Sequence, residues 1–89
     1  WPQSRIEHWS TLLRARAIEN QAYVVGVNAI GYGAGIEYGG HSVVIDPKGK
    51  ILASTQQEQG VLESRINLDE LTRWRKEFPV LNQMLPEWP

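Results

Sequence analysis

The feature that most constrains this chain is a helical pattern of apolar residues that is wider than a single face. Between Ser4 and Gln21, apolar residues recur at helical spacing and others widen the stripe: Ile6, Trp9, Leu13 and Ala17, flanked by Leu12, Ala15 and Ile18. Ser4 followed by Glu7 has the spacing of a capping box, which predicts that a helix begins there. A helix that is apolar on two sides packs against two partners. We therefore expect a helix from Ser4 to Gln21 inside a layered fold.

Three extended segments are predicted after this helix. Ala22–Asn28 is a nearly continuous run of β-favouring residues, typical of a central strand buried on both faces. Residues 46–49, Asp-Pro-Lys-Gly, are a strong turn signal, because proline presets the second turn position and glycine accepts a positive φ at the fourth. His41–Asp46 and Lys50–Ser54 are therefore predicted to form an antiparallel hairpin. The five glycines within residues 31–40 predict a loop that belongs to no regular element.

The last third of the chain predicts one more strand, a short helix and an arm. Val61–Ile66 is a candidate for a third antiparallel strand. Asn67 with Glu70 repeats the capping pattern and opens a short helix that Pro79 ends. Residues 79–89 hold three prolines among large apolar side chains, which predicts an extended arm lying across another surface. The expected fold class is α+β, with a long helix, mostly antiparallel strands, a short helix and this arm.

The charge balance narrows the set of partners. Nine Lys and Arg residues stand against ten Asp and Glu, without a block of like charge, so we expect no binding to nucleic acid or to an anionic membrane. The apolar stretch Tyr23–Val27 is far shorter than the roughly 18 residues that a membrane-spanning helix needs. With no signal peptide expected, we predict a soluble, cytoplasmic protein. The only methionine is Met84, so we expect residues 1–89 to be an incomplete part of one longer domain.

The residue types that carry chemistry do not form a catalytic pattern within this chain. The absence of cysteine excludes disulfides, thiolate metal sites and a cysteine nucleophile from it. His8 and His41 fall on different predicted elements without the spacing of metal ligands. Ser42 neighbours His41, but adjacent strand residues point to opposite faces and do not form a nucleophile and base. Residues 31–35 resemble a phosphate-binding loop only in composition, because no helix opens after them. We therefore predict no catalytic residue and no metal site here.

The order of short motifs carries more information than any single residue. It comprises Trp1-Pro2, His8-Trp9, Leu12-Leu13, residues 16–20, Tyr23-Val24-Val25 with Asn28, Gly39-Gly40-His41-Ser42, and Ile45-Asp46-Pro47 with Gly49. This string closely resembles the C-terminal part of the nitrilase superfamily of carbon–nitrogen hydrolases. Among its branches, the chain looks most like the ω-amidase-type enzymes that hydrolyse small aliphatic amides of dicarboxylic acids. The likeness covers Trp1 to about Leu81.

The resemblance implies a share of a four-layer α-β-β-α sandwich in which three residues do the chemistry. A cysteine attacks the amide carbon, a glutamate is base and proton donor, and a lysine supports the oxyanion. In the family all three precede the segment matched here, so no catalytic residue carries over, and no cofactor is implied. The substrate of the full-length protein is then a small amide, with Trp1 and Tyr38 as substrate-binding residues.

The resemblance also implies a homo-oligomer. The predicted helix over residues 4–21 is similar to one that family dimers pack against its symmetry mate, which suits an apolar pattern on two sides. The residues expected at this dimer interface are Trp9, Leu13 and Arg16.

Two other functions stay open at the level of sequence. One is a non-enzymatic α+β module that associates with itself through Trp9 and the C-terminal arm. The other, within the same family, is a glutaminase-type domain that supplies ammonia to a partner, because the loops that set specificity lie mostly upstream. A cysteine upstream of Trp1, with a lysine and a glutamate further back, distinguishes an enzyme from the module.

Overall fold

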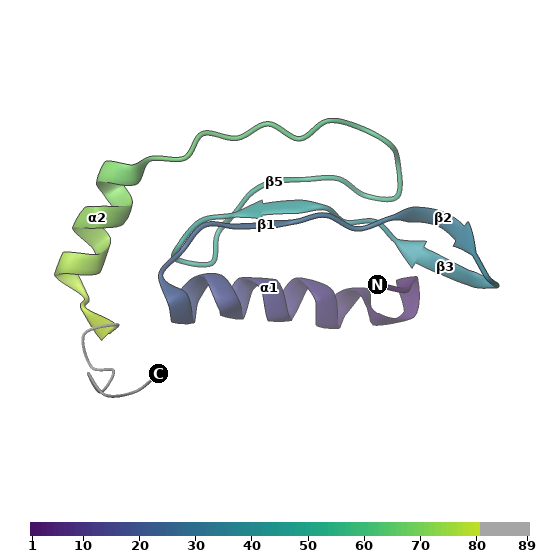
Figure 1. Cartoon of the computed structure of the whole chain (residues 1–89), viewed down its shortest axis with the longest axis horizontal. Helices are drawn as coiled ribbons and strands as arrows, with labels where there is room; N and C mark the ends of the chain where they lie inside the picture. Colours follow the sequence, from purple (N-terminus) through teal and green to yellow (C-terminus); the bar gives the residue numbers. More distant parts are fainter. Residues whose placement is uncertain (81–89) are drawn as a thin grey trace.

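The computed structural model describes residues 1–80 and places a long helix against a small antiparallel sheet. The elements are η1 (Gln3–Arg5), α1 (Ile6–Asn20), β1 (Val24–Gly26), β2 (Ile30–Gly33), β3 (Ile36–Gly39), β4 (Val43–Ile45), β5 (Ile51–Ser54) and α2 (Leu68–Glu77). The hairpin β2–β3 projects from one end of this body, and α2 lies at the other end (Figure 1). The predicted α+β class is confirmed. The predicted arm over residues 79–89 lies, from residue 81 onward, outside the described residues.

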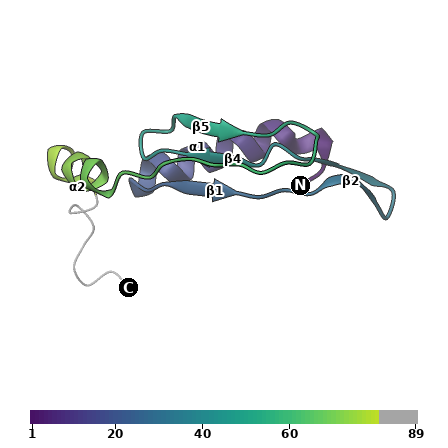
Figure 2. The same cartoon turned by 90° about the horizontal axis from the view of Figure 1, so that it is seen from above.

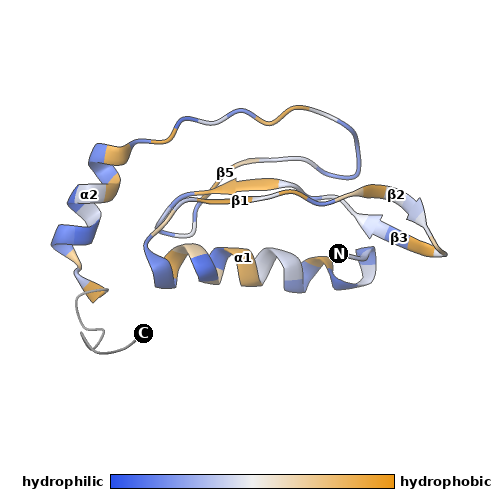
Figure 3. Ribbon diagram, in the orientation of Figure 1, coloured by the Kyte–Doolittle hydropathy of each residue, from blue (hydrophilic) through white to orange (hydrophobic). Residues whose placement is uncertain are grey.

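The core lies between α1 and the three-stranded sheet, whose strand order is β1-β4-β5. Figure 2 shows these strands lying over α1. The buried cluster consists of Ala17, Val43 and Ile45, with Leu13 and Val24 packed against it. Hydrophobic segments mark β1 and the strand beside it, whereas β2 and β3 are mixed and hydrophobic and hydrophilic segments alternate along α1 (Figure 3). Gly26 permits the close approach of helix and sheet, because a Cβ there would lie 2.5 Å from Leu13 Cδ1.

The long helix is where the sequence predicts it, but its N-terminus is built differently. The chain enters through the 3-10 turn η1, in which Arg5 N–H donates to Pro2 O at 3.0 Å. Neither η1 nor α1 has a side-chain cap. The predicted capping box of Ser4 and Glu7 is therefore wrong, because the 3-10 turn takes Ser4 into η1 and moves the helix start to Ile6.

The hairpin predicted around residues 46–49 is confirmed, since β4 and β5 pair antiparallel. Asp46 Oδ1 accepts from the backbone N–H groups of Lys48 and Lys50, each at 2.9 Å. Gly49 adopts a φ of +86° and donates its N–H to Asp46 O at 2.9 Å. The turn is therefore tied both by its own backbone and by the aspartate side chain.

The short helix α2 is also confirmed. Asn67 Oδ1 accepts from the backbone N–H of Glu70 at 3.0 Å, which caps the first turn. The helix ends at Glu77, one residue before Phe78 and two before Pro79, as the proline predicts.

The prediction that residues 22–28 form a central strand buried on both faces is wrong. Among the described residues, β1 lies at one edge of its sheet and pairs with β4 alone, while β4 is central. Val25 is 63% exposed and Val27 80% exposed, because α1 covers only the opposite face of the sheet. An apolar run in the sequence indicates that a strand is buried by neighbouring elements. Which strand becomes central is decided by how the distant hairpin β4–β5 pairs with β1.

The loop predicted over residues 31–40 is instead the hairpin β2–β3. The strands pair from Ile30 with Gly39 to Gly33 with Ile36. Ala34 and Gly35 form its two-residue turn with φ values of +51° and +78°, the positive values that a type I′ turn requires. The glycines thus lie in the turn and in the two paired strands of a hairpin.

The strand predicted over residues 61–66 is absent, and the segment is extended but unpaired. Val61 is 86% exposed and Ile66 51% exposed. A β-favouring sequence forms a strand only beside a free sheet edge, and among residues 1–80 this segment pairs with none.

Candidate functional site

Three polar residues meet at the end of the sheet where β1 ends and β4 begins. Asn28 follows β1, Ser42 precedes β4 and Thr55 follows β5, so antiparallel pairing brings them to the same sheet end. Ser42 Oγ accepts from Asn28 N–H at 3.0 Å, and Thr55 Oγ1 accepts from Ser42 N–H at 3.1 Å. We call these three residues the polar cluster. The hydroxyls of Ser42 and Thr55 bind the backbone of neighbouring segments and hold the sheet end in one arrangement.

The polar cluster borders a cavity of about 560 Å³ on the sheet face away from α1. Val25 and Val44 form an apolar wall of this cavity, and Leu62 and Glu58 contribute from the segment after β5. A concave space that is apolar along one wall and polar at one end is the usual form of a small-molecule site. This cavity and the polar cluster together are the candidate functional site.

The chain enters β4 in an unusual backbone conformation beside the polar cluster. Gly40 and His41 have φ values of +63° and +54°. His41 N–H donates to Gln56 O at 2.9 Å, and His41 O accepts from Trp9 Nε1 at 2.9 Å. The imidazole Nδ1 lies 2.7 Å from Gly39 O. Residues other than glycine are uncommon in the left-handed region and gather at functional sites, so this segment marks the sheet end as a candidate site.

The two predicted substrate-binding residues lie beside the polar cluster but do not line the cavity. Trp1 O accepts from Asn28 Nδ2 and from Gly39 N–H, each at 3.1 Å. Tyr38 lies in β3 and forms an isolated bridge with Pro2. The backbones of Trp1 and Tyr38 thus lie close together at the base of the hairpin β2–β3, while the Tyr38 ring lies against Gly33 further along it. Their contact with a substrate stays a prediction.

The three residues predicted at a dimer interface do not share one surface. Trp9 is 9% exposed and Leu13 packs on the core, so both face the sheet of their own chain. The Arg16 side chain is 58% exposed and forms an ion pair within α1. The exposed apolar residues of this helix are Leu12 and Ile18. The oligomer contact stays a prediction.

Asn28 and Thr55 were not predicted as site residues from the sequence. The available signal was their position, since each is a polar residue directly after a β-favouring run. No group of three or more His, Cys, Asp or Glu among residues 1–80 is placed to hold a metal ion. In the same part of the chain, no helix has the length and apolar character needed to cross a membrane.

Comparison with known proteins decides the family. The family model described as carbon-nitrogen hydrolase matches residues 1–76. The chain belongs to the carbon–nitrogen hydrolase family. The nitrilase-superfamily, ω-amidase-like resemblance read from the order of motifs is confirmed.

The relatives of this carbon–nitrogen hydrolase chain include amidases. A 2-oxoglutaramate amidase of Paenarthrobacter nicotinovorans is 51% identical over 82 residues, which cover 92% of this chain and 28% of the relative. The ω-amidase YafV of Yersinia enterocolitica is 44% identical over 84 residues, covering 92% and 33%. A crystal structure of a CN-hydrolase superfamily protein from Xanthomonas campestris, with an arsenic adduct in its active site, matches with a TM-score of 0.90 and 36% identity, covering 100% and 34%. The chain thus spans about a third of the length of these relatives.

Proposed function

We propose that this chain is the C-terminal part of an amidase that hydrolyses small aliphatic amides, monoamides of dicarboxylic acids among them. The observation that carries the proposal is the 51% identity to a 2-oxoglutaramate amidase along 92% of the chain. The ω-amidase relatives support the same substrate class. The family match supports the coarser reaction, hydrolysis of a carbon–nitrogen bond.

The proposed mechanism uses a cysteine, a glutamate and a lysine that lie upstream of this chain. The chain itself has no cysteine. Ser42 is not the proposed nucleophile, because its hydroxyl is already bonded to the backbone of Asn28. Its Oγ accepts from Asn28 N–H at 3.0 Å and donates to Asn28 O at 3.4 Å. In the proposed reaction the thiolate adds to the amide carbon, the lysine stabilises the oxyanion, and the glutamate delivers a proton to the departing ammonia. Water then hydrolyses the thioester, releasing the acid and restoring the thiol. The isolated chain is therefore expected to be inactive.

In this proposal the present chain supplies one wall of the substrate pocket. The sheet face away from α1 carries exposed apolar side chains, Val25 and Val27, of the kind that a further layer covers. We propose that a second sheet of the four-layer α-β-β-α sandwich faces this surface and encloses the cavity from that side. The candidate functional site then lies between the two sheets, beside the reacting amide, with Trp1 and Tyr38 at the substrate entrance.

The proposal is tested by ammonia release from a dicarboxylic monoamide. The longer protein that contains this chain is expected to hydrolyse it, and the chain of 89 residues alone is expected to release none. Replacing the upstream cysteine by serine is expected to abolish turnover. Hydrolysis by the isolated chain would contradict the assignment, and preferred turnover of glutamine would favour the ammonia-supplying alternative.

The role of Tyr38 is tested against a matched tyrosine. Tyr38→Phe is expected to raise KM for the monoamide with kcat little changed, if its hydroxyl binds substrate. Tyr32→Phe removes the same atom from a side chain that is 79% exposed near the hairpin tip. Equal KM values for both variants and the parent would remove Tyr38 from the substrate entrance.

A homo-oligomer contact along α1 and a cytoplasmic location belong to the same proposal. Leu12 is exposed on α1 one turn before Arg16, and Ile18 is exposed on another flank, beside Gly49, while Trp9 and Leu13 face the sheet. Leu12→Lys is expected to weaken association in sedimentation experiments, and Thr11→Lys adds the same charge at an exposed polar position as a control. A monomeric parent protein at high concentration would contradict the contact.

A further inference from the structure

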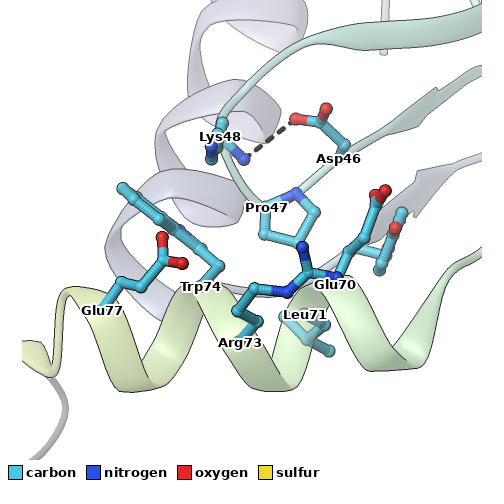
Figure 4. Close-up of a pocket in the computed structure, with 9 residues that line it drawn as sticks. Asp46, Pro47, Lys48, Glu70, Leu71, Arg73, Trp74 and Glu77 are labelled. Carbon is cyan, nitrogen blue, oxygen red and sulfur yellow. Dashed lines mark hydrogen bonds between the residues drawn. The ribbon is translucent and has the colours of Figure 1, made fainter.

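A second cavity lies at the opposite end of the chain from the candidate functional site. It has a volume of about 310 Å³ and separates α2 from the β4–β5 turn. Figure 1 shows α2 far from the hairpin β2–β3, and Figure 4 shows the residues of the turn facing those of the helix. The cavity shares no lining residue with the candidate functional site. We call it the α2 cavity.

The α2 cavity is lined by charges of both signs that are not paired with one another. Lys48 and Arg73 are cationic, and Asp46, Glu70 and Glu77 are anionic. No ion pair within residues 1–80 involves any of these five residues. Figure 4 shows Glu77 and Lys48 beside Trp74, with Arg73 and Glu70 further along the same helix. A ligand that enters here meets both kinds of charge.

Trp74 gives the cavity an aromatic wall. Lys48 Nζ lies 4.4 Å from the centre of its ring, so a cation–π interaction holds the ammonium at this wall. The indole Nε1 is buried and has no acceptor among residues 1–80. A buried donor without a partner is unfavourable and rare, and a water molecule that accepts from it is one recognised explanation.

Both walls of the cavity are held in place by hydrogen bonds. The turn is tied through Asp46, as described above. At the start of α2, Tyr23 Oη accepts from Asn67 N–H at 3.1 Å. Near its end, Arg75 Nε donates to Gln21 O at 2.9 Å, and Gln21 Nε2 donates to Phe78 O at 2.7 Å. A site whose walls are already ordered loses less entropy on binding.

We propose that the α2 cavity binds a small zwitterion, an α-amino acid, with its carboxylate against Lys48 and its ammonium against Glu77, beside Trp74. A simple anion meets the carboxylate of Glu77, and a simple cation meets the ammonium of Lys48, whereas a molecule with both charges complements both groups. The volume of about 310 Å³ is within the range of small-molecule sites. Because this cavity is separate from the candidate functional site, the amino acid binds without displacing an amide substrate.

The test compares three matched probes on the complete protein that contains this chain, by isothermal titration calorimetry. The probes are L-alanine, propionate, which lacks the ammonium, and ethylamine, which lacks the carboxylate. L-alanine is expected to bind about tenfold more tightly than either single-charge analogue. Titration to about 10 mM is sufficient, because a dissociation constant of about 1 mM is then nearly saturated. No binding of L-alanine, or equal binding of propionate or ethylamine, would overturn the proposal.

Charge-removing variants locate the binding. Lys48→Gln and Glu77→Gln are each expected to weaken L-alanine binding about fivefold. Lys50→Gln and Glu63→Gln remove exposed charges of the same kinds outside the cavity and are expected to leave it unchanged. Equal effects of the lysine variants would place the binding elsewhere. If a variant does not fold, as judged by circular dichroism, the probe comparison on the unaltered protein still decides the ligand class. Amide hydrolysis is not part of either readout, so failure of this proposal is distinct from failure of the proposed function.

Discussion

Replacing Gly40 by alanine tests how the chain enters β4 beside the candidate functional site. Gly40 has a φ of +63°, and a Cβ added there would lie 2.3 Å from Gln56 O. The left-handed conformation costs alanine about 1–2 kcal/mol. Relieving the contact displaces Gln56 O, which accepts the 2.9 Å hydrogen bond from His41 N–H, and this strain and weakened bond add about 1–3 kcal/mol. We expect the free energy of unfolding to fall by about 2–5 kcal/mol in total.

Gly35→Ala is the matched control for this variant. Gly35 has a φ of +78°, and its Cβ would have no neighbour within 4 Å, so only the conformational cost of about 1–2 kcal/mol applies. Both variants are measured by equilibrium urea unfolding followed by tryptophan fluorescence, on the full-length protein. Gly40→Ala is expected to lose at least about 1 kcal/mol more than Gly35→Ala. Equal losses would refute the argument that the approach of Gln56 requires glycine at position 40.

Three further variants test the contacts that fix the sheet end, the turn and α2. Trp9→Phe removes the indole donor to His41 O and is expected to lower the free energy of unfolding by about 1–2 kcal/mol; an unchanged thermal midpoint would contradict this. Asn67→Ala removes the cap of α2 and is expected to lower the local stability of this helix by about 1 kcal/mol, so that the backbone amides of α2 exchange faster with solvent. Equal exchange rates in the variant and the parent would show that the cap is not formed. Asp46→Ala removes the acceptor of two backbone N–H groups and is expected to cost about 1–3 kcal/mol in urea unfolding, with no loss counting against the described turn.

Local signals in the sequence were reliable where neighbouring residues hold the structure together. The turn after β4 was predicted because Pro47 and Gly49 set its backbone, and Asp46 bonds groups only two and four residues away. The cap of α2 was predicted for the same reason, since Asn67 and Glu70 are three residues apart. The capping box of Ser4 failed because a competing local structure, the 3-10 turn, occupies that position.

The candidate functional site was less predictable, because its members come from distant parts of the chain. Asn28, Ser42 and Thr55 meet only after three strands pair, and no spacing among them is periodic. Trp9 was expected at an oligomer contact, yet its indole donates to His41 O across 32 residues of chain. A buried tryptophan and an interface tryptophan look alike in sequence, since both are large apolar groups that avoid water.

The sequence by itself determined the α+β class, the long and short helices, the β4–β5 hairpin and, through the order of its motifs, membership of the carbon–nitrogen hydrolase family. Tertiary structure alone decided that β4 is the central strand, that the glycine-rich segment is a hairpin, and that residues 61–66 are left unpaired. The physical reason is the separation along the sequence of the residues that interact. Helix caps and tight turns depend on the torsions and hydrogen bonds of adjacent residues, whereas strand order and the meeting of site residues depend on which surfaces are covered once the whole sheet has formed.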